Sequence, residues 1–153
     1  MKTLALALFI GCFIISCTQK QPDKVHTRQV FDARGLKVIT SFANRKQLTL
    51  SVLYGNPLAM QSAAKGSQKH IAGEVFKLVT FHQANNKYWY GSYINGAVKS
   101  IETINTKTSS LGDTVIYYSV QGGKAPLNAT GNTASRSERI NSILSHRPLV
   151  FPQ

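Results

Sequence analysis

Two stretches of alternating apolar and polar residues constrain the fold of this chain more than any other feature. The residues that share one face are Leu36, Val38, Thr40 and Phe42 in the first stretch, and Leu48, Leu50, Val52 and Tyr54 in the second. A period of two is typical of a strand that is buried on one side. The polar residues 44–46 between the stretches favour a turn. The sequence therefore predicts an antiparallel hairpin over residues 36–54.

The segment GNPLAMQSAAKG at residues 55–66 predicts a short helix. Asn56 is a good N-cap residue, Pro57 suits the first helical position, and Gly66 suits the position just past the end. The residues between them are mostly good helix formers. We expect a helix of two or three turns.

A second helix is predicted near the C-terminus. Residues 135–138 read Ser-Arg-Ser-Glu, which is the pattern of a capping box. Ile140, Ile143 and Leu144 follow at helical spacing, and Pro148 is expected to end the helix.

Three further stretches, residues 74–82, 97–104 and 114–120, are rich in β-branched and aromatic residues. The first is almost continuously apolar, as expected of a central strand. The polar residues 105–113 predict a loop between the last two strands, and residues 121–133 predict another. Because strands and helices do not alternate regularly, the predicted fold class is α+β. We expect a single domain with an antiparallel β-sheet flanked by two or three short helices.

The first residues indicate export. Residues 4–16 form an apolar run after Lys2 that is shorter than the roughly 20 residues needed to span a bilayer. The run is typical of a secretory signal, and its end, Ile-Ile-Ser-Cys at residues 14–17, resembles the lipobox of bacterial lipoproteins. We therefore expect residues 1–16 to be a lipoprotein signal peptide and Cys17 to be lipidated. The alternative is an ordinary secretory signal that happens to contain a cysteine.

The expected mature chain has a single cysteine, Cys17, and this residue carries the lipid. Cys12 leaves with the signal peptide, so no disulfide, paired-cysteine metal site or thiol nucleophile is expected. Residues 17–29 predict a lipidated N-terminus with a polar tether, and residues 30–153 the folded domain. The expected location is the bacterial cell envelope, with the protein anchored by lipid to a membrane and facing the periplasm.

The chain is strongly basic, with a formal net charge of +12, of which the removal of Lys2 takes away one. The basic residues are scattered, with no run of four or more, which argues against a nucleic-acid partner. Anionic lipid head groups or acidic envelope polymers fit better. The simplest interpretation is a solvated basic surface.

The stretch KYWYGSYINGAVKSIE at residues 87–102 contains the only tryptophan, Trp89. Trp89, Tyr90 and Tyr93 could line a pocket for a flat or apolar ligand, with His82 as a further candidate. Alternatively, they pack the sheet against a helix or a second subunit. We expect the packing role, with Trp89 largely buried, because a domain without disulfides depends on large core side chains.

Four segments together resemble the cytochrome P-460 domain family, and in particular its small exported bacterial members. They are TLSVLYGNPLAMQSA at residues 49–63, GEVFKLVTF at 73–81, WYGSYINGAVKSIE at 89–102 and SERINSILSHRPLVFP at 137–152. The resemblance implies an antiparallel sheet with flanking helices, usually in a homodimer, with a cofactor cavity beside the sheet. In the family, a c-type haem is held by a Cys-x-x-Cys-His motif near the C-terminus, and close relatives bind nitric oxide or carbon monoxide.

This chain departs from the family at the haem motif. Residues 105–147 contain no cysteine, so haem cannot be attached by thioether bonds, and His146 lacks the motif that would make it an axial ligand. No lysine matches the position that is cross-linked to haem in the hydroxylamine-oxidising members. The resemblance therefore extends to the fold and not to the haem chemistry. We expect no cofactor.

The remaining polar residues give no clear catalytic site. His26, His70, His82 and His146 are far apart in the sequence, and a haem or metal held by His82 without covalent attachment is the alternative left open. A carboxylate pair of Glu74 and Glu102 is conceivable because their strands could pair. The expected function is a non-catalytic binding or assembly role, with an unknown small-molecule ligand. The alternatives are a protein that binds haem or a small gas, and a degenerate hydroxylamine-oxidising cytochrome.

Overall fold

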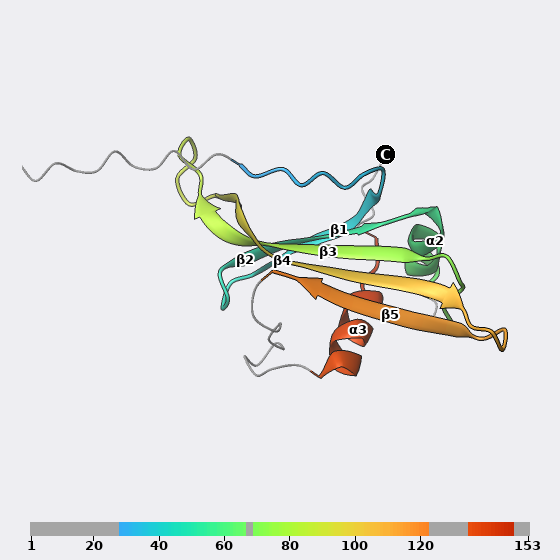
Figure 1. Cartoon of the computed structure of the whole chain (residues 1–153). Coiled ribbons are helices and arrows are strands. Elements are labelled where there is room, and N and C mark those ends of the chain that lie inside the picture. The colour runs from blue at the N-terminus through green and yellow to red at the C-terminus, as the bar shows by residue number, and fades with distance from the viewer. Residues whose placement is uncertain (1–27, 67–68, 123–134, 149–153) are drawn as a thin grey trace, which may run out of the picture.

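A five-stranded antiparallel sheet organises the chain. The computed structural model describes residues 28–66, 69–122 and 135–148 (Figure 1). The strands lie in the order β1-β2-β3-β4-β5, so each pairs with its neighbour in sequence. They are β1 (Lys37–Asn44), β2 (Thr49–Gly55), β3 (Val75–Asn85), β4 (Tyr93–Thr108) and β5 (Thr114–Gln121). The helices of the described part are α2 (Pro57–Lys65) and α3 (Arg136–Leu144), and the predicted α+β class is confirmed.

Helix α2 begins and ends where its sequence predicts. Asn56 has an extended backbone, and its Oδ1 accepts a hydrogen bond from the Ala59 amide at 3.0 Å. Gly66 ends the helix with φ 61°, in the left-handed region that favours glycine. A side chain at this position would also collide with Arg147, because an added Cβ would lie 2.8 Å from the Arg147 Nη2.

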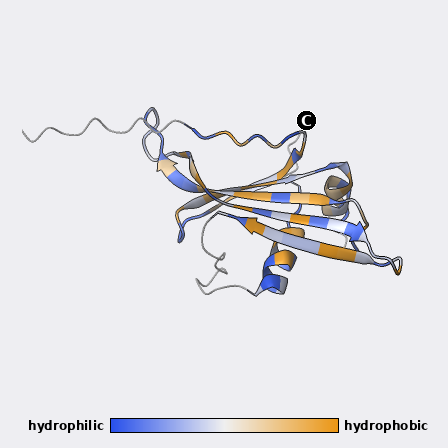
Figure 2. Cartoon of the chain, in the orientation of Figure 1, coloured by the Kyte–Doolittle hydropathy of each residue, from blue (hydrophilic) through white to orange (hydrophobic). Residues whose placement is uncertain are grey.

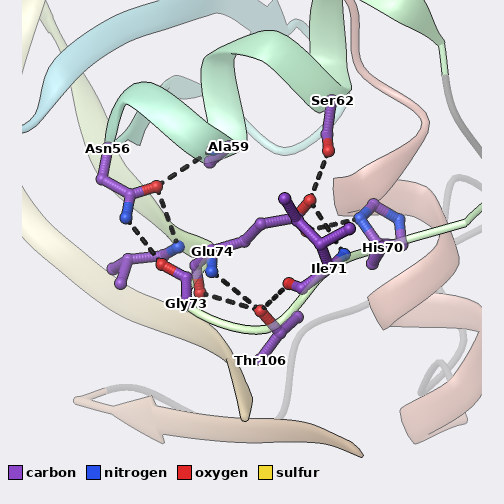
Figure 3. Close-up of polar contacts among 9 residues, drawn as sticks. Asn56, Ala59, Ser62, His70, Ile71, Gly73, Glu74 and Thr106 are labelled. Carbon is purple, nitrogen blue, oxygen red and sulfur yellow. Dashed lines mark hydrogen bonds and ion pairs between the residues drawn. The ribbon is translucent and has the colours of Figure 1, made fainter. Parts of the chain in front are cut away.

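Asn56 also joins the start of α2 to the start of β3. Its Oδ1 accepts a second bond from the Val75 amide at 3.2 Å, and its Nδ2 donates to the Gly73 carbonyl at 2.7 Å (Figure 3). The N-cap of the helix is therefore also a tertiary contact.

Helix α3 carries the predicted capping box. The Ser135 Oγ accepts from the Glu138 amide at 3.2 Å, and the Glu138 Oε2 accepts from the Ser135 amide at 2.9 Å. The first turn is hydrophilic (Figure 2). The helix ends at Leu144, with Ser145 as its C-cap, shortly before Pro148.

The core lies between one face of the sheet and the two helices. Its fully buried members are Ile39, Leu53, Ala59, Ala63, Phe76, Leu78, Ile104 and Ile143. Both helices contribute, and so do the first four strands. The same face carries two carboxylates with almost no exposed area, Glu74 and Glu102.

The apolar row predicted for β2 is not the row that faces the helices. Leu50, Val52 and Tyr54 share a face, as expected, and are half-buried; the fully buried residues are Thr49, Ser51, Leu53 and Gly55. The side chains of the helix-facing row are mostly small because α2 packs close to them. An added Cβ on Gly55 would lie 3.0 Å from the Ala59 Cβ and 2.6 Å from the Ile39 Cδ1.

The alternation predicted for the first strand is interrupted by a bulge. The pairing of β1 with β2 shifts between Val38 and Thr40. As a result, Val38 is exposed while Ile39 and Thr40 are both buried. The prediction that Val38 and Thr40 share a face is therefore wrong, because the extra residue of a bulge breaks the period of two.

The N-terminal residues of the described part cross the opposite face of the sheet from α3 (Figure 1). The Phe31 ring lies 5.7 Å from the Tyr54 ring, and the Lys77 Nζ lies 5.7 Å from the centre of the Phe31 ring. In β3, Leu78 to Phe81 are buried without a break, so both faces of this strand are covered. This agrees with the central position predicted for it.

Strand β4 is longer than predicted. It continues to Thr108, and its last residues pair with the start of β5, so the predicted loop over 105–113 shortens to 109–113. The polar composition of this segment is misleading because Thr106 is buried and forms hydrogen bonds on the inner face.

We expect Asn56→Ala to destabilise the protein more than Ser135→Ala. Loss of an ordinary N-cap costs about 1 kcal/mol. Asn56→Ala also leaves the Val75 amide and the Gly73 carbonyl without their partner, which raises the expected cost to about 2–3 kcal/mol. Urea unfolding of the two variants measures the difference. Equal losses would show that the contacts of Asn56 with residues 73 and 75 contribute nothing.

Candidate functional site

The aromatic residues predicted to be structural lie outside the core. Trp89 is 73% exposed, and Tyr90 is fully exposed, in the turn between β3 and β4. Tyr93, at the start of β4, is 56% exposed. The prediction that Trp89 is largely buried is wrong: the core on the helix side is filled by other residues, and Asn86 and Gly91 make a turn here. His82 is exposed on β3.

A different polar centre forms around Glu74, at the start of β3. Its Oε1 accepts hydrogen bonds from the Ser62 hydroxyl on α2 and from the Ile71 amide at 3.2 Å. Its Oε2 accepts from the His70 Nδ1 at 2.7 Å. All three partners are donors, so they compensate the burial of an acceptor-only carboxylate (Figure 3).

Thr106 attaches this centre to β4. The Glu74 amide donates to the Thr106 Oγ1 at 2.8 Å, and the Thr106 hydroxyl donates to the Ile71 carbonyl at 2.5 Å. The position of Glu74 is therefore fixed at its backbone as well as at its carboxylate.

His70 connects the buried carboxylate with a pocket on the helix side of the sheet. The pocket has a volume of about 530 Å³, and we call it the α2–α3 pocket. It is lined by Gly66, His70, Ile116, Asn141, Leu144, Ser145, His146 and Arg147. Among the described residues of the lining there is no carboxylate, because Glu74 lies behind His70 and is occupied by its three donors.

Both histidines of the pocket are held through the same ring nitrogen. The Nδ1 of His70 donates to Glu74, and the His70 ring meets Phe76 edge-on at 6.0 Å. The Nδ1 of His146 donates to the Ser142 carbonyl at 2.7 Å, and its ring stacks on Phe42 at 4.5 Å. Each ring is therefore fixed in orientation through its Nδ1, and no hydrogen bond joins its Nε2 to another of the described residues.

The geometry does not form a hydroxyl-activating triad. A serine nucleophile needs the histidine between the hydroxyl and the carboxylate. Here the carboxylate of Glu74 lies in the middle, because it accepts from both Ser62 and His70. Among the residues that the structure describes, no three His, Cys, Asp or Glu side chains are grouped so that they could hold a metal ion.

The second buried carboxylate, Glu102, has partners of its own and does not pair with Glu74. The Arg139 Nε and Nη2 donate to its two oxygens at 2.7 and 2.6 Å, and the Tyr118 hydroxyl donates at 2.7 Å. This fork joins α3 to β4 and β5. Burial works to lower the pKa of Arg139, but the hydrogen bonds and charge of Glu102 outweigh it and raise that pKa.

Sequence reasoning missed the α2–α3 pocket. His70 is far in the sequence from the adjacent His146 and Arg147, and none of them shows ligand spacing. Comparison with protein-family models and with curated protein sequences found no match.

Tyr118→Phe is expected to make the protein less sensitive to alkaline pH. Burial, followed by the hydrogen bond to Glu102 and its charge, raises the pKa of Tyr118 above its ordinary value of about 10. The unfolded chain therefore loses this proton at a lower pH than the folded chain, and the free energy of unfolding decreases as the pH rises above about 10. Urea unfolding over this range should show a smaller decrease in Tyr118→Phe. The exposed Tyr117 provides the control: Tyr117→Phe should keep the wild-type slope, and equal slopes in both variants would contradict the assignment.

Proposed function

We propose that the mature chain is a lipid-anchored protein of the bacterial cell envelope that binds a small anionic molecule in the α2–α3 pocket without converting it. The observation that carries this proposal is the set of three basic side chains, His70, His146 and Arg147, in a pocket whose described lining has no carboxylate. The net charge of the mature chain, +12 less one for Lys2, would further attract anionic ligands.

Arg147 is the group that would bind the anionic part of the ligand. Its guanidinium lies over Gly66, and the residue is exposed at the pocket. A planar guanidinium pairs with carboxylate or phosphate through two parallel hydrogen bonds. Glycine at position 66 leaves the space that this side chain occupies.

The two histidines would orient the same ligand. Their Nε2 atoms are polar groups on rings that Glu74, Ser142 and stacking hold in place. Ile116 and Leu144 add a small apolar wall. Groups that are fixed before the ligand arrives lose little entropy on binding, and a volume of about 530 Å³ lies within the usual range for small-molecule sites.

The envelope location rests on the sequence. The apolar run and the lipobox-like residues 14–17 lie outside the described residues, as does most of the predicted tether. In the described part of the chain, no helix has the length and apolar character needed to cross a membrane. The antiparallel sheet with flanking helices supports the proposed kinship with the cytochrome P-460 domain family, because that resemblance implies the same architecture.

Haem held without covalent bonds is the second candidate, favoured by the two histidines in one pocket. The other lining residues fit it poorly. A haem macrocycle needs a broad apolar slot, whereas the apolar side chains in this lining are Ile116 and Leu144. His82, which the sequence offered as a haem ligand, is exposed on β3 and does not line the pocket. A Soret band after incubation with haem, lost in His70→Ala, would favour this candidate.

Cys17→Ala is expected to abolish acylation and to leave the signal peptide uncleaved by the lipoprotein signal peptidase. The reason is that the thiol is the acceptor of the diacylglyceryl group. Mass spectrometry of the N-terminal peptide, together with membrane fractionation, measures both effects. A wild-type mature chain without fatty acid would contradict the proposed anchor.

Arg147→Gln is expected to weaken the binding of anions in the α2–α3 pocket by about tenfold or more, because a charge-assisted hydrogen bond is lost. Calorimetric titration with citrate and with inorganic phosphate measures the affinity, and amide chemical shifts of Gly66 and Ser145 report where the anion binds. Arg45→Gln removes the same charge from the β1–β2 turn, outside the pocket, and should keep the wild-type affinity. If both variants bind equally, or if neither anion shifts these amides, the proposed site is wrong.

A further inference from the structure

The turn between β3 and β4 exposes three aromatic rings in succession. We call residues 86–92 the aromatic tip. Tyr88 is 87% exposed and Trp89 is 73% exposed, while Tyr90 has no shielding at all. Large aromatic rings grouped in this way are unusual on a surface that contacts only water, and they indicate an interaction site.

The aromatic tip is an ordered turn. The Asn86 amide donates to the Ser92 carbonyl at 3.0 Å, and the Asn86 Oδ1 accepts from the Tyr88 amide at 3.0 Å. The Ser92 amide and hydroxyl both donate to the Trp89 carbonyl, at 3.2 and 3.1 Å. Gly91 provides the positive φ, 76°, that closes the turn. The backbone therefore holds the rings outward.

The β1–β2 turn lies at the same end of the sheet. Thr49 pairs with His82, and the Gln83 amide donates to the Leu48 carbonyl at 2.9 Å. This turn adds another exposed apolar side chain, because Leu48 is 62% exposed. We call residues 43–50 and 82–95 together the tip end of the sheet.

The tip end is basic and contains no acidic residue. Its cationic side chains are Arg45, Lys46 and Lys87. The Lys87 Nζ lies 5.9 Å from the centre of the Tyr88 ring. The described acidic residues nearest in sequence are Glu74 and Glu102, both outside the tip end. Aromatic rings flanked by lysine and arginine are the composition that suits the interface between water and an anionic bilayer.

The chain enters the described structure at this same end. The Gln29 amide donates to the Asn95 carbonyl at 2.9 Å, so residue 29 is attached to the base of the β3–β4 hairpin. Ten residues separate Cys17 from Arg28. A fully extended chain of that length reaches at most about 40 Å. A lipid on Cys17 would therefore keep Arg28 and the tip end close to the bilayer.

We propose that the tip end of the sheet docks on the head-group region of an anionic lipid bilayer, with the rings of Tyr88, Trp89 and Tyr90 inserted among the head groups. Arg45, Lys46 and Lys87 contact the lipid phosphates. The orientation of the domain on the bilayer in this proposal rests on the proposed lipid anchor at Cys17. The rings and charges are features of the domain itself, so the two proposals can fail separately.

Trp89 provides the test, because it is the only tryptophan of the chain. Full-length protein is purified from membranes and reconstituted in vesicles of phosphatidylcholine with or without phosphatidylglycerol. Fluorescence is then quenched with iodide in water, or with phosphatidylcholine brominated at different depths. In the anionic vesicles we expect a blue-shifted emission, several-fold less quenching by iodide, and strongest quenching by the shallowest bromines. Emission and iodide quenching equal to those of the protein in detergent-free buffer with no lipid would overturn the proposal.

Matched variants assign the effect to the tip end. Tyr88→Ser combined with Tyr90→Ser should reduce the blue shift, whereas Tyr117→Ser, at an exposed tyrosine on β5, should not. Arg45→Gln combined with Lys46→Gln should reduce the dependence on phosphatidylglycerol, because two of the three cations are lost. Equal effects of the tip and control variants would count against the tip end. A blue shift that appears without lipid when the protein concentration is raised would also count against it, because the partner would then be a second copy of the chain.

Mass spectrometry of the N-terminal peptide in the same preparation separates this proposal from the lipid anchor. An acylated Cys17 with a water-exposed Trp89 overturns the docking of the tip and leaves the anchor. A chain without acyl groups whose Trp89 still enters anionic vesicles supports the docking and overturns the anchor.

Discussion

The burial of the Glu74 carboxylate is the constraint on which the rest of the structure depends. An ionised carboxylate removed from water requires donors around it. The donors are Ser62 of α2, the Ile71 amide and His70. In addition, the Oγ1 of Thr106 on β4 accepts a hydrogen bond from the Glu74 amide. Through its side chain and its backbone amide, one residue thereby fixes a helix, a loop and two strands relative to each other, and it sets the orientation of the histidine that faces the α2–α3 pocket. Removal of the carboxylate would leave these donors buried without a partner.

The structure separates the two proposed functions in space. The pocket uses residues before β3 and at the end of α3, whereas the aromatic tip follows the last residue of β3. Glu102 stabilises α3 through Arg139, independently of Glu74. A protein that docks at the tip end would therefore leave the pocket lining, on the helix side of the sheet, outside the contact with the bilayer. This arrangement suits a binding protein held at a membrane surface.

Local features were predictable because their partners lie within a few residues. The Asn56 cap, the Ser135–Glu138 capping box and Gly66 involve contacts over four residues or fewer, and all appear where expected. Alternation likewise predicts strands, but it does not say which face meets the helices. In β2 the face that meets the helices carries mostly small residues, because α2 lies so close to the strand that there is no room for a side chain at Gly55. A single bulge in β1 was enough to break the predicted pattern.

The sequence by itself determined the fold class, the starts of both helices and the central position of β3, since these depend on short-range hydrogen bonding and on periodic burial. Only the tertiary structure decided the sites. His70 and Arg147 line one pocket because the Arg147 guanidinium, three residues after the end of α3, lies against Gly66 at the end of α2. Trp89 is exposed because the core was completed by other side chains. Composition alone does not distinguish a core tryptophan from an exposed one, because burial is set by which elements cover a residue and not by its hydrophobicity.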